Sequence, residues 1–178
     1  NEMYARDTSK KIRATWQSKG KSGEHLTTIP PYGYMKDPDN PKRHWIVDDE
    51  AAAVVRQIFA WCMAGFGPSQ IAKKLKEAKV DCPTVHWMKM GRNAPAKTPD
   101  IPYDWAPRTI TGILEKQEYL GHMVNFKTRK QSYKSKKKIE NPPEQWKIFE
   151  NTHEAIIDEE TFTRVQELRK NKRRPART

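Results

Sequence analysis

The chain has 178 residues and carries 34 Lys and Arg against 22 Asp and Glu, a net charge of +12 at pH 7. This length fits one domain with or without an appendage, and six Trp, six Tyr and five Phe argue against a disordered chain. No apolar run is long enough to cross a bilayer, and no basic-then-apolar start predicts a signal peptide. Cys62 and Cys82 lack zinc-site or disulfide spacing, so we predict buried thiols in a reducing compartment, no metal and no other cofactor.

The positive charge is gathered in three groups. Residues 127–138 hold seven Lys and Arg and no acid, and residues 169–177 hold six more. A third group lies within residues 10–21. Such self-repelling blocks are usually solvated loops or tails that meet phosphate, and their lack of an interleaved apolar face disfavours a membrane surface. The charge pattern therefore predicts a nucleic-acid partner.

The first predicted element is the end of a helix at residues 9–20, with Ile12 and Trp16 one turn apart and a glycine as its stop. The polar residues 21–28 predict a flexible linker. A proline-rich turn follows the linker, and residues 45–47 predict a short strand.

Two amphipathic helices come next. Asp48 is the predicted N-cap of the first, whose apolar stripe ends at Cys62 before two glycines. Pro68 begins the second, and its apolar face is predicted to consist of Ile71, Ala72, Leu75 and Ala78. Residues 81–104 contain four prolines and predict a long irregular loop.

The last third of the chain predicts a short helix, a hairpin and a final helix. The short helix spans residues 107–115, and its inward face is predicted to be Ile110, Ile113 and Leu114. Residues 119–126 and 145–149 predict the two strands of a hairpin whose long tip is the basic block 127–138. Asp158 is the predicted cap of the final helix, with Ile157 and Phe162 as its hydrophobic staple.

The order helix, helix, strand, basic loop, strand outlines a helix-turn-helix with a wing. The predicted fold class is therefore α+β and mostly helical: a winged helix-turn-helix-like DNA-binding domain with a basic β-hairpin and a preceding linker helix. In this arrangement the helix at residues 68–79 braces the helix at residues 107–115, which is the candidate reading helix.

The candidate reading helix has a polar face opposite Ile110. A helical wheel places Arg108, Gly112 and Glu115 on that face, flanked by Thr109 and Thr111. An arginine at a helix start can reach guanine O6 and N7, and threonine can contact phosphate or a thymine methyl group. Gly112 costs about 1 kcal/mol relative to alanine inside a helix, and a close backbone approach to DNA would explain that cost.

Several segments occur in an order that resembles one protein family, the large serine recombinases, and specifically their DNA-binding recombinase domain. These segments are YARDTSKKIRATWQSKGKSGE, PPYGY, DDEAAAVVRQIFAWCMAGFGPSQIAKKL, WAPRTITGIL, EYLGHMV and THEAIIDEETFTRVQELRK. The family includes phage integrases and mobile-element resolvases, and the resemblance covers nearly the whole chain.

The resemblance implies a division of the chain. Residues 1–28 would be the end of a linker helix from a catalytic domain plus a flexible linker, residues 29–168 the recombinase DNA-binding domain, and residues 169–178 a basic tail that leads to a zinc ribbon. Neither the catalytic domain nor the zinc ribbon is in this sequence. We therefore expect a parent recombinase with a serine nucleophile, and a fragment that is inactive alone. Ser9 lies in a YARDTS segment that mimics a catalytic motif, but no strand precedes it and we do not interpret it as the nucleophile.

The implied function is recognition of part of an attachment-site half-site during integration or excision of a mobile element. The partner would be double-stranded DNA, with the parent a dimer on one site and a tetramer in the synaptic complex. No membrane partner is expected, and the implied location is the bacterial cytoplasm at the nucleoid.

The predicted contacts fall into three sets. Base edges in the major groove would be read by Arg108, Thr109 and Thr111. Phosphates would be held from the hairpin by Lys127, Arg129, Lys130, Lys136, Lys137 and Lys138. The DNA backbone or minor groove near the crossover site would be contacted by Lys10 and Arg13.

Two features depart from the family pattern. Ala106 stands where relatives place a capping residue such as serine, so the helix start depends on Pro107 or on the preceding loop. The loop at residues 81–104 is longer than usual, which suggests additional DNA contacts from Lys89, Arg92 and Lys97.

Two other classes remain open. One is a winged-helix transcriptional regulator, which would lack the linker helix and the PPYGY segment. The other is an RNA-binding module that uses the basic blocks on A-form helices. The five histidines show no i, i+4 pair, and the carboxylate groups lie where helix capping explains them, so a metal nuclease is disfavoured.

Overall fold

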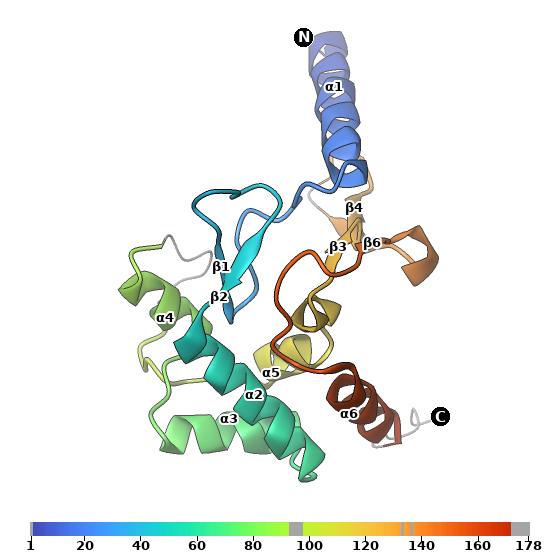
Figure 1. Cartoon of the computed structure of the whole chain (residues 1–178). Helices are drawn as coiled ribbons and strands as arrows, with labels where there is room; N and C mark the ends of the chain where they lie inside the picture. The colour runs from blue at the N-terminus through green and yellow to red at the C-terminus, as the bar shows by residue number, and fades with distance from the viewer. Residues whose placement is uncertain (1, 93–97, 133, 136, 172–178) are drawn as a thin grey trace, which may run out of the picture. The chain divides into compact units, whose positions relative to one another are not determined.

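The computed structural model describes residues 2–92, 98–132, 134, 135 and 137–171. The chain forms two compact units that interleave along the sequence. Unit 1 comprises the residues up to Pro31 together with Met35–Ile46 and Gln117–Ala155. Unit 2 comprises Tyr32–Tyr34, Val47–Lys116 and the residues from Ile156 onward. Figure 1 shows the elements of both units.

Unit 2 is helical. Its helices are α2 (Asp49–Met63), α3 (Pro68–Glu77), α4 (Pro83–Lys89), α5 (Pro107–Leu114) and α6 (Glu159–Asn171). Helix α5 packs on α3 and α2, and α6 packs on α2 and α5 (Figure 1). The fully buried core side chains include Val55, Ile58, Phe59, Ile71, Leu75, Ile110, Leu114 and Val165. The predicted bracing of the helix at 107–115 by the helix at 68–79 is confirmed as the α3–α5 packing.

The predicted helix starts are confirmed. The Asp48 carboxylate accepts a hydrogen bond from the Ala51 amide at 3.3 Å, so it caps α2. The Asp158 carboxylate accepts from the Thr161 amide at 2.8 Å and caps α6. Ile157 and Phe162 are buried beside that cap, as the staple predicted. Ala78 was predicted on the apolar face of α3 and is exposed, because α3 ends at Glu77 and the chain turns away.

The prediction of an irregular loop over residues 81–104 is wrong in part, because this segment contains helix α4. Pro83 occupies its first position, and Val85 and His86 are buried on its inner face. The His86 Nε2 atom lies 2.8 Å from the second oxygen of Asp48, and the Tyr32 ring packs edge-on against both His86 and Trp105. A helix this short leaves little periodic signal, so the proline pattern masked it.

Unit 1 contains α1 (Glu2–Lys21) and two nested antiparallel strand pairs. Strand β3 (Met123–Asn125) pairs with β6 (Lys147–Phe149), with Val124 opposite Ile148, which confirms the predicted hairpin. Within its tip, β4 (Thr128–Lys130) pairs with β5 (Lys138–Glu140). The predicted strand at 119–126 is shorter than expected, because η1 (Gln117–Leu120) is a 3-10 helix; a second one, η2 (Pro143–Gln145), precedes β6.

A further two-stranded sheet consists of β1 (Tyr34–Lys36) and β2 (Trp45–Val47). The strand at residues 45–47 is confirmed, and β1 was not predicted. The connecting turn is closed by His44, whose Nδ1 atom lies 2.7 Å from an Asp37 carboxylate oxygen.

The C-terminal end of α1 is anchored within unit 1. Gly20 was predicted to stop this helix, but it lies inside the helix and is buried. A Cβ atom there would lie 2.4 Å from the Phe126 ring, so any larger residue would force the Phe126 and Leu26 side chains to shift. The Asn125 side-chain amide donates to the carbonyls of Gly20 at 3.1 Å and Glu24 at 2.9 Å. Part of the segment predicted to be a flexible linker is therefore held by hydrogen bonds.

The free cysteines Cys62 and Cys82 are both buried, as predicted. Among the described residues, no helix combines the length and apolar character needed to span a bilayer.

Candidate nucleic-acid interface

Helix α5 presents two sharply different faces. Ile110, Ile113 and Leu114 are buried against the unit 2 core, as predicted. Arg108 is exposed, and Thr109 and Thr111 are half-buried. No side chain caps the helix start at Ala106, and Pro107 occupies the first position. Pro107 has no N–H, and the Thr109 and Ile110 amides donate to the Ala106 carbonyl at 2.9 and 3.4 Å, so the start of α5 presents mainly its positive dipole end beside Arg108.

The C-terminal end of α5 is held by α6. The Gln166 side-chain amide donates to the Leu114 carbonyl at 2.7 Å. The Arg169 guanidinium donates to the Glu115 carboxylate at 2.8 Å, so the one acidic group predicted on the polar face of α5 is neutralised. Core packing and these two bonds fix the orientation of α5 within unit 2.

The β4–β5 hairpin is exposed and basic. Register places Lys130 directly opposite Lys138, and Arg129 opposite Ile139. Arg129, Lys130, Lys137 and Lys138 are all exposed, while Lys136 lies outside the described residues. Like charges directly opposite each other destabilise an antiparallel pair, so a bound polyanion would relieve this repulsion.

Lys127 differs from the other predicted phosphate contacts. Its ammonium lies 2.6 Å from a Glu118 carboxylate oxygen, and the two side chains are 31% and 10% exposed. The same ammonium lies 5.6 Å from the centre of the Trp146 ring. Lys127 therefore has an internal partner at the base of the hairpin, which leaves less of its charge for an external phosphate.

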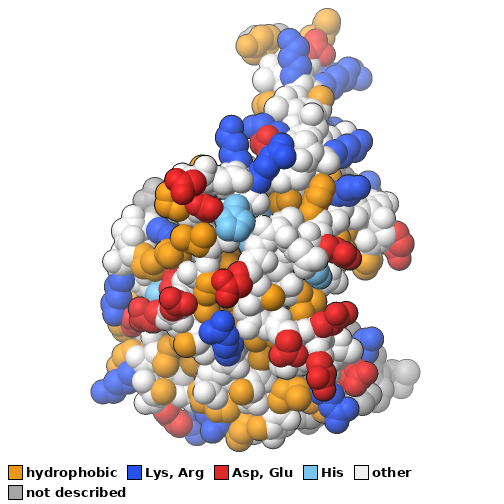
Figure 2. All heavy atoms as spheres, viewed as in Figure 1, with side chains coloured by type: hydrophobic (Ala, Val, Ile, Leu, Met, Phe, Trp, Pro, Cys, Tyr) orange, Lys and Arg blue, Asp and Glu red, His pale blue; other side chains and the backbone are white. Residues whose placement is uncertain are grey.

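Helix α1 carries the remaining predicted contacts. Lys10 lies 4.0 Å from Asp7, and Arg13 donates to the Ser9 hydroxyl at 3.5 Å. These side chains are exposed, and Figure 2 shows Lys and Arg gathered along α1. Lys134 in the hairpin loop pairs with Glu2 at the start of α1. The hairpin loop thus reaches the start of α1, and we call the exposed basic residues of these two elements together the basic surface of unit 1.

The sequence model of the Recombinase family matches residues 49–172, which include α5 and the hairpin. The chain belongs to the Recombinase family. Two solved structures resemble its fold, each with a TM-score of 0.50 over 90% of this chain. One is described as a crystal structure of an LSR–DNA complex, at 20% identity. The other concerns the sequence requirements of the Listeria innocua prophage attP site, at 21% identity. This chain spans 39% and 51% of those two chains, and no curated protein matches it significantly.

Two further basic residues of this Recombinase-family chain are engaged internally. Lys89 pairs with Asp81, and the Arg92 guanidinium donates to the Tyr34 carbonyl at 3.4 Å. Lys97, the third residue predicted to contact DNA from this segment, lies outside the described residues. Lys89 and Arg92 stabilise the local fold around α4, and their use as DNA contacts would require these bonds to open.

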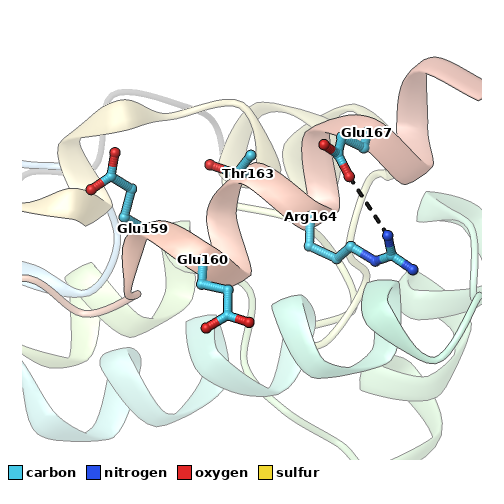
Figure 3. Close-up of a pocket in the computed structure, with 5 residues that line it drawn as sticks. All are labelled: Glu159, Glu160, Thr163, Arg164 and Glu167. Atoms are coloured by element: carbon cyan, nitrogen blue, oxygen red, sulfur yellow. Dashed lines mark ion pairs between the residues drawn. The ribbon is translucent and has the colours of Figure 1, made fainter.

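The outer face of α6 has the opposite charge. Glu159, Glu160, Thr163, Arg164 and Glu167 line a shallow hollow (Figure 3). Arg164 pairs with Glu167 at 3.6 Å, which leaves Glu159 and Glu160 as excess negative charge. Among the described residues, no cluster of three or more His, Cys, Asp or Glu could hold a metal ion. This face repels phosphate and is a poor candidate for the interface.

Two histidines of unit 1, His25 and His153, pack against Trp45. The His25 ring stacks on Trp45 with centroids 4.0 Å apart, and neither ring nitrogen of His25 has a hydrogen-bond partner. Burial, followed by the nearby His153, lowers the pKa of His25 to about 4. Burial also lowers the pKa of His153, whose Nε2 atom lies 2.7 Å from the Glu118 carbonyl. These rings are neutral packing groups at pH 7.

Proposed function

We propose that this chain binds duplex DNA at part of an attachment-site half-site, as the DNA-binding region of a bacterial site-specific serine recombinase. The observation that carries this proposal is α5: its inner face is buried, its C-terminal end is bonded to α6, and its outer face offers Arg108 beside an uncapped helix N-terminus. A rigid helix with a basic polar face is the usual reader of the major groove.

Similar folds support the choice of DNA. One of the two similar chains is described as an LSR–DNA complex, and the other concerns a prophage attP site. In the proposed complex Arg108 donates to guanine O6 and N7, and Thr109 and Thr111 contact phosphate or thymine methyl groups.

The basic surface of unit 1 would supply affinity rather than sequence selection. Arg129, Lys130, Lys137 and Lys138 would hold phosphates as a wing, with Lys136 beside them and Lys127 in a lesser role. Lys10 and Arg13 on α1 would contact the DNA backbone. This wing completes the winged helix-turn-helix that we propose for the region.

The rest of the proposal concerns the parent protein. Residues 29–168 would form the DNA-binding domain, residues 1–28 would connect it to a catalytic domain, and residues 169–178 would lead to a zinc ribbon. The parent would act as a dimer on each site and as a tetramer at synapsis, at the bacterial nucleoid.

Selection from a randomised duplex library with this chain tests the proposal. We expect enrichment of a defined sequence, with tighter binding to that duplex than to a scrambled one of equal composition. With about six phosphates neutralised, log K should fall against log salt with a slope near about −5. A slope shallower than about −2 would show that the basic surfaces do not face DNA. Stronger competition by duplex RNA than by duplex DNA would favour an RNA-binding module instead.

A further inference from the structure

Gly112 lies in the middle of α5, one turn after Arg108 on the same polar face. Apart from its two chain neighbours and the nearby backbone of its own helix, a Cβ atom added at Gly112 would have no atom of the described residues within 4 Å. Its backbone is helical, and its φ is not in the left-handed range where glycine is favoured. Within the part of the chain that the structure describes, nothing requires glycine here.

Other glycines of the chain show what a structural requirement looks like. At Gly20 a Cβ would lie 2.4 Å from the Phe126 ring, and at Gly121 it would lie 2.6 Å from the His153 carbonyl oxygen. Gly121 also has a φ of +88°. Gly112 has neither restriction, although glycine weakens a helix interior relative to alanine. No contact among the described residues explains why a destabilising glycine stands at position 112, so we look for the explanation in a bound partner.

We propose that bound DNA occupies the space over Gly112, and that position 112 sets how deeply α5 enters the major groove. This inference rests on the proposed function and names a specificity-determining position within it. With only a hydrogen on the α-carbon, the α5 backbone can come into van der Waals contact with a sugar, a phosphate or a base edge. That close approach brings Arg108 within reach of base atoms.

A larger side chain at this position would lift α5 out of the groove. The loss would fall on contacts made from α5, because the hairpin and α1 bind phosphates independently of this helix. Sequence selection would therefore decrease more than overall affinity for DNA.

The test compares Gly112→Ala and Gly112→Leu with the wild-type chain. Both residues are strong helix formers, so the melting temperature should rise by about 2–4 °C for alanine and should not fall for leucine. Affinity for the duplex selected by the wild-type chain should decrease about tenfold for alanine and more for leucine. Affinity for the scrambled duplex should change less than twofold.

Thr163→Ala is the matched control. Thr163 is exposed on the acidic outer face of α6, where alanine also favours the helix and where DNA is not expected. This variant should be at least as stable as the wild type and should bind both duplexes equally well.

The possible failures are distinguishable. If the wild-type chain enriches no duplex sequence, the proposed function fails and the inference fails with it. If selection succeeds and Gly112→Ala binds the selected duplex as tightly as the wild type, only the role of position 112 is overturned. A lower melting temperature of Gly112→Ala, or an equal loss on both duplexes, would also overturn it.

Discussion

Helix α5, which carries Arg108, and the basic β4–β5 hairpin are the two regions with the strongest claim to contact DNA, and they are built in opposite ways. One face of α5 is buried in the unit 2 core, and its C-terminal end is bonded to α6. The hairpin strands carry exposed side chains and place Lys130 opposite Lys138. A fixed helix can hold a hydrogen-bond pattern against a base, whereas mobile ammonium groups suit phosphate. We therefore expect α5 to select the DNA sequence and the hairpin to supply affinity for phosphate.

Of the substitutions considered, Arg108→Ala should have the largest effect on the difference in affinity between the selected and the scrambled duplex. Loss of a bidentate contact to guanine should weaken binding to the selected duplex by about 1–3 kcal/mol and barely change binding to a scrambled duplex. Fluorescence anisotropy with both duplexes measures the two affinities. An equal loss on both would show that α5 is not the reader, and residues 81–104 would then be the next candidate.

Lys130→Ala combined with Lys138→Ala should affect both duplexes alike. Removal of two phosphate contacts should reduce the salt slope by about 2 and weaken binding about tenfold near physiological salt. The variant should not lose stability, because it removes a like-charge pair. Lys127→Ala is the informative comparison, because Lys127 pairs with Glu118. This substitution should lower the stability of the chain but change the slope of log K against log salt little. If the double variant keeps the full salt slope, the hairpin does not bind phosphate.

Acid should remove the stability that His25 and His153 contribute to unit 1. The folded pKa of His25 is about 4, below the unfolded value of 6.5, so the unfolded chain binds a proton first as the pH falls. Stability from His25 is present above pH 6.5 and is lost toward pH 4, with about 1 kcal/mol lost between pH 7 and 5.5. The lowered pKa of His153 acts in the same direction.

His25→Phe supplies the control for that pH dependence. Phenylalanine keeps an aromatic ring against Trp45 and cannot titrate, so the melting temperature of this variant should decrease less between pH 7 and 5.5. Asp37 and Asp158 also have lowered pKa values, but their contributions are lost only below their ordinary value of 3.8. Equal pH profiles of wild type and variant would assign the acid sensitivity to other groups.

The sequence was most informative where local signals agreed with packing. Helices α2, α3, α5 and α6 were predictable because a cap or proline precedes a 3.6-residue apolar period. The β3–β6 pairing followed from two apolar segments flanking a basic block.

Nonlocal features could not be predicted in the same way. Helix α4 has only seven residues within a proline-rich segment, and β4 and β5 lack apolar alternation. Lys127 looked like any other lysine of the basic block, because its partner Glu118 reaches it only through the 3-10 turn that replaces the expected strand. For α5, the wheel identified the exposed Arg108, but the bond from Arg169 to Glu115 depends on a helix more than fifty residues away.

The smallest expected effect on DNA affinity comes from breaking the bond between Arg169 and Glu115. Arg169→Gln would leave the Glu115 carboxylate unneutralised at the end of the polar face of α5 and should weaken binding to both duplexes about threefold, as a nearby like charge does at high dielectric. Stability should change little, since the Glu115 side chain is 46% exposed. Adding Glu115→Gln to Arg169→Gln removes the carboxylate and should restore wild-type affinity, while Glu115→Gln alone should bind at least as tightly as wild type. If the double variant stays as weak as Arg169→Gln, then Arg169 itself contacts phosphate, and α6 must be added to the DNA-binding surface.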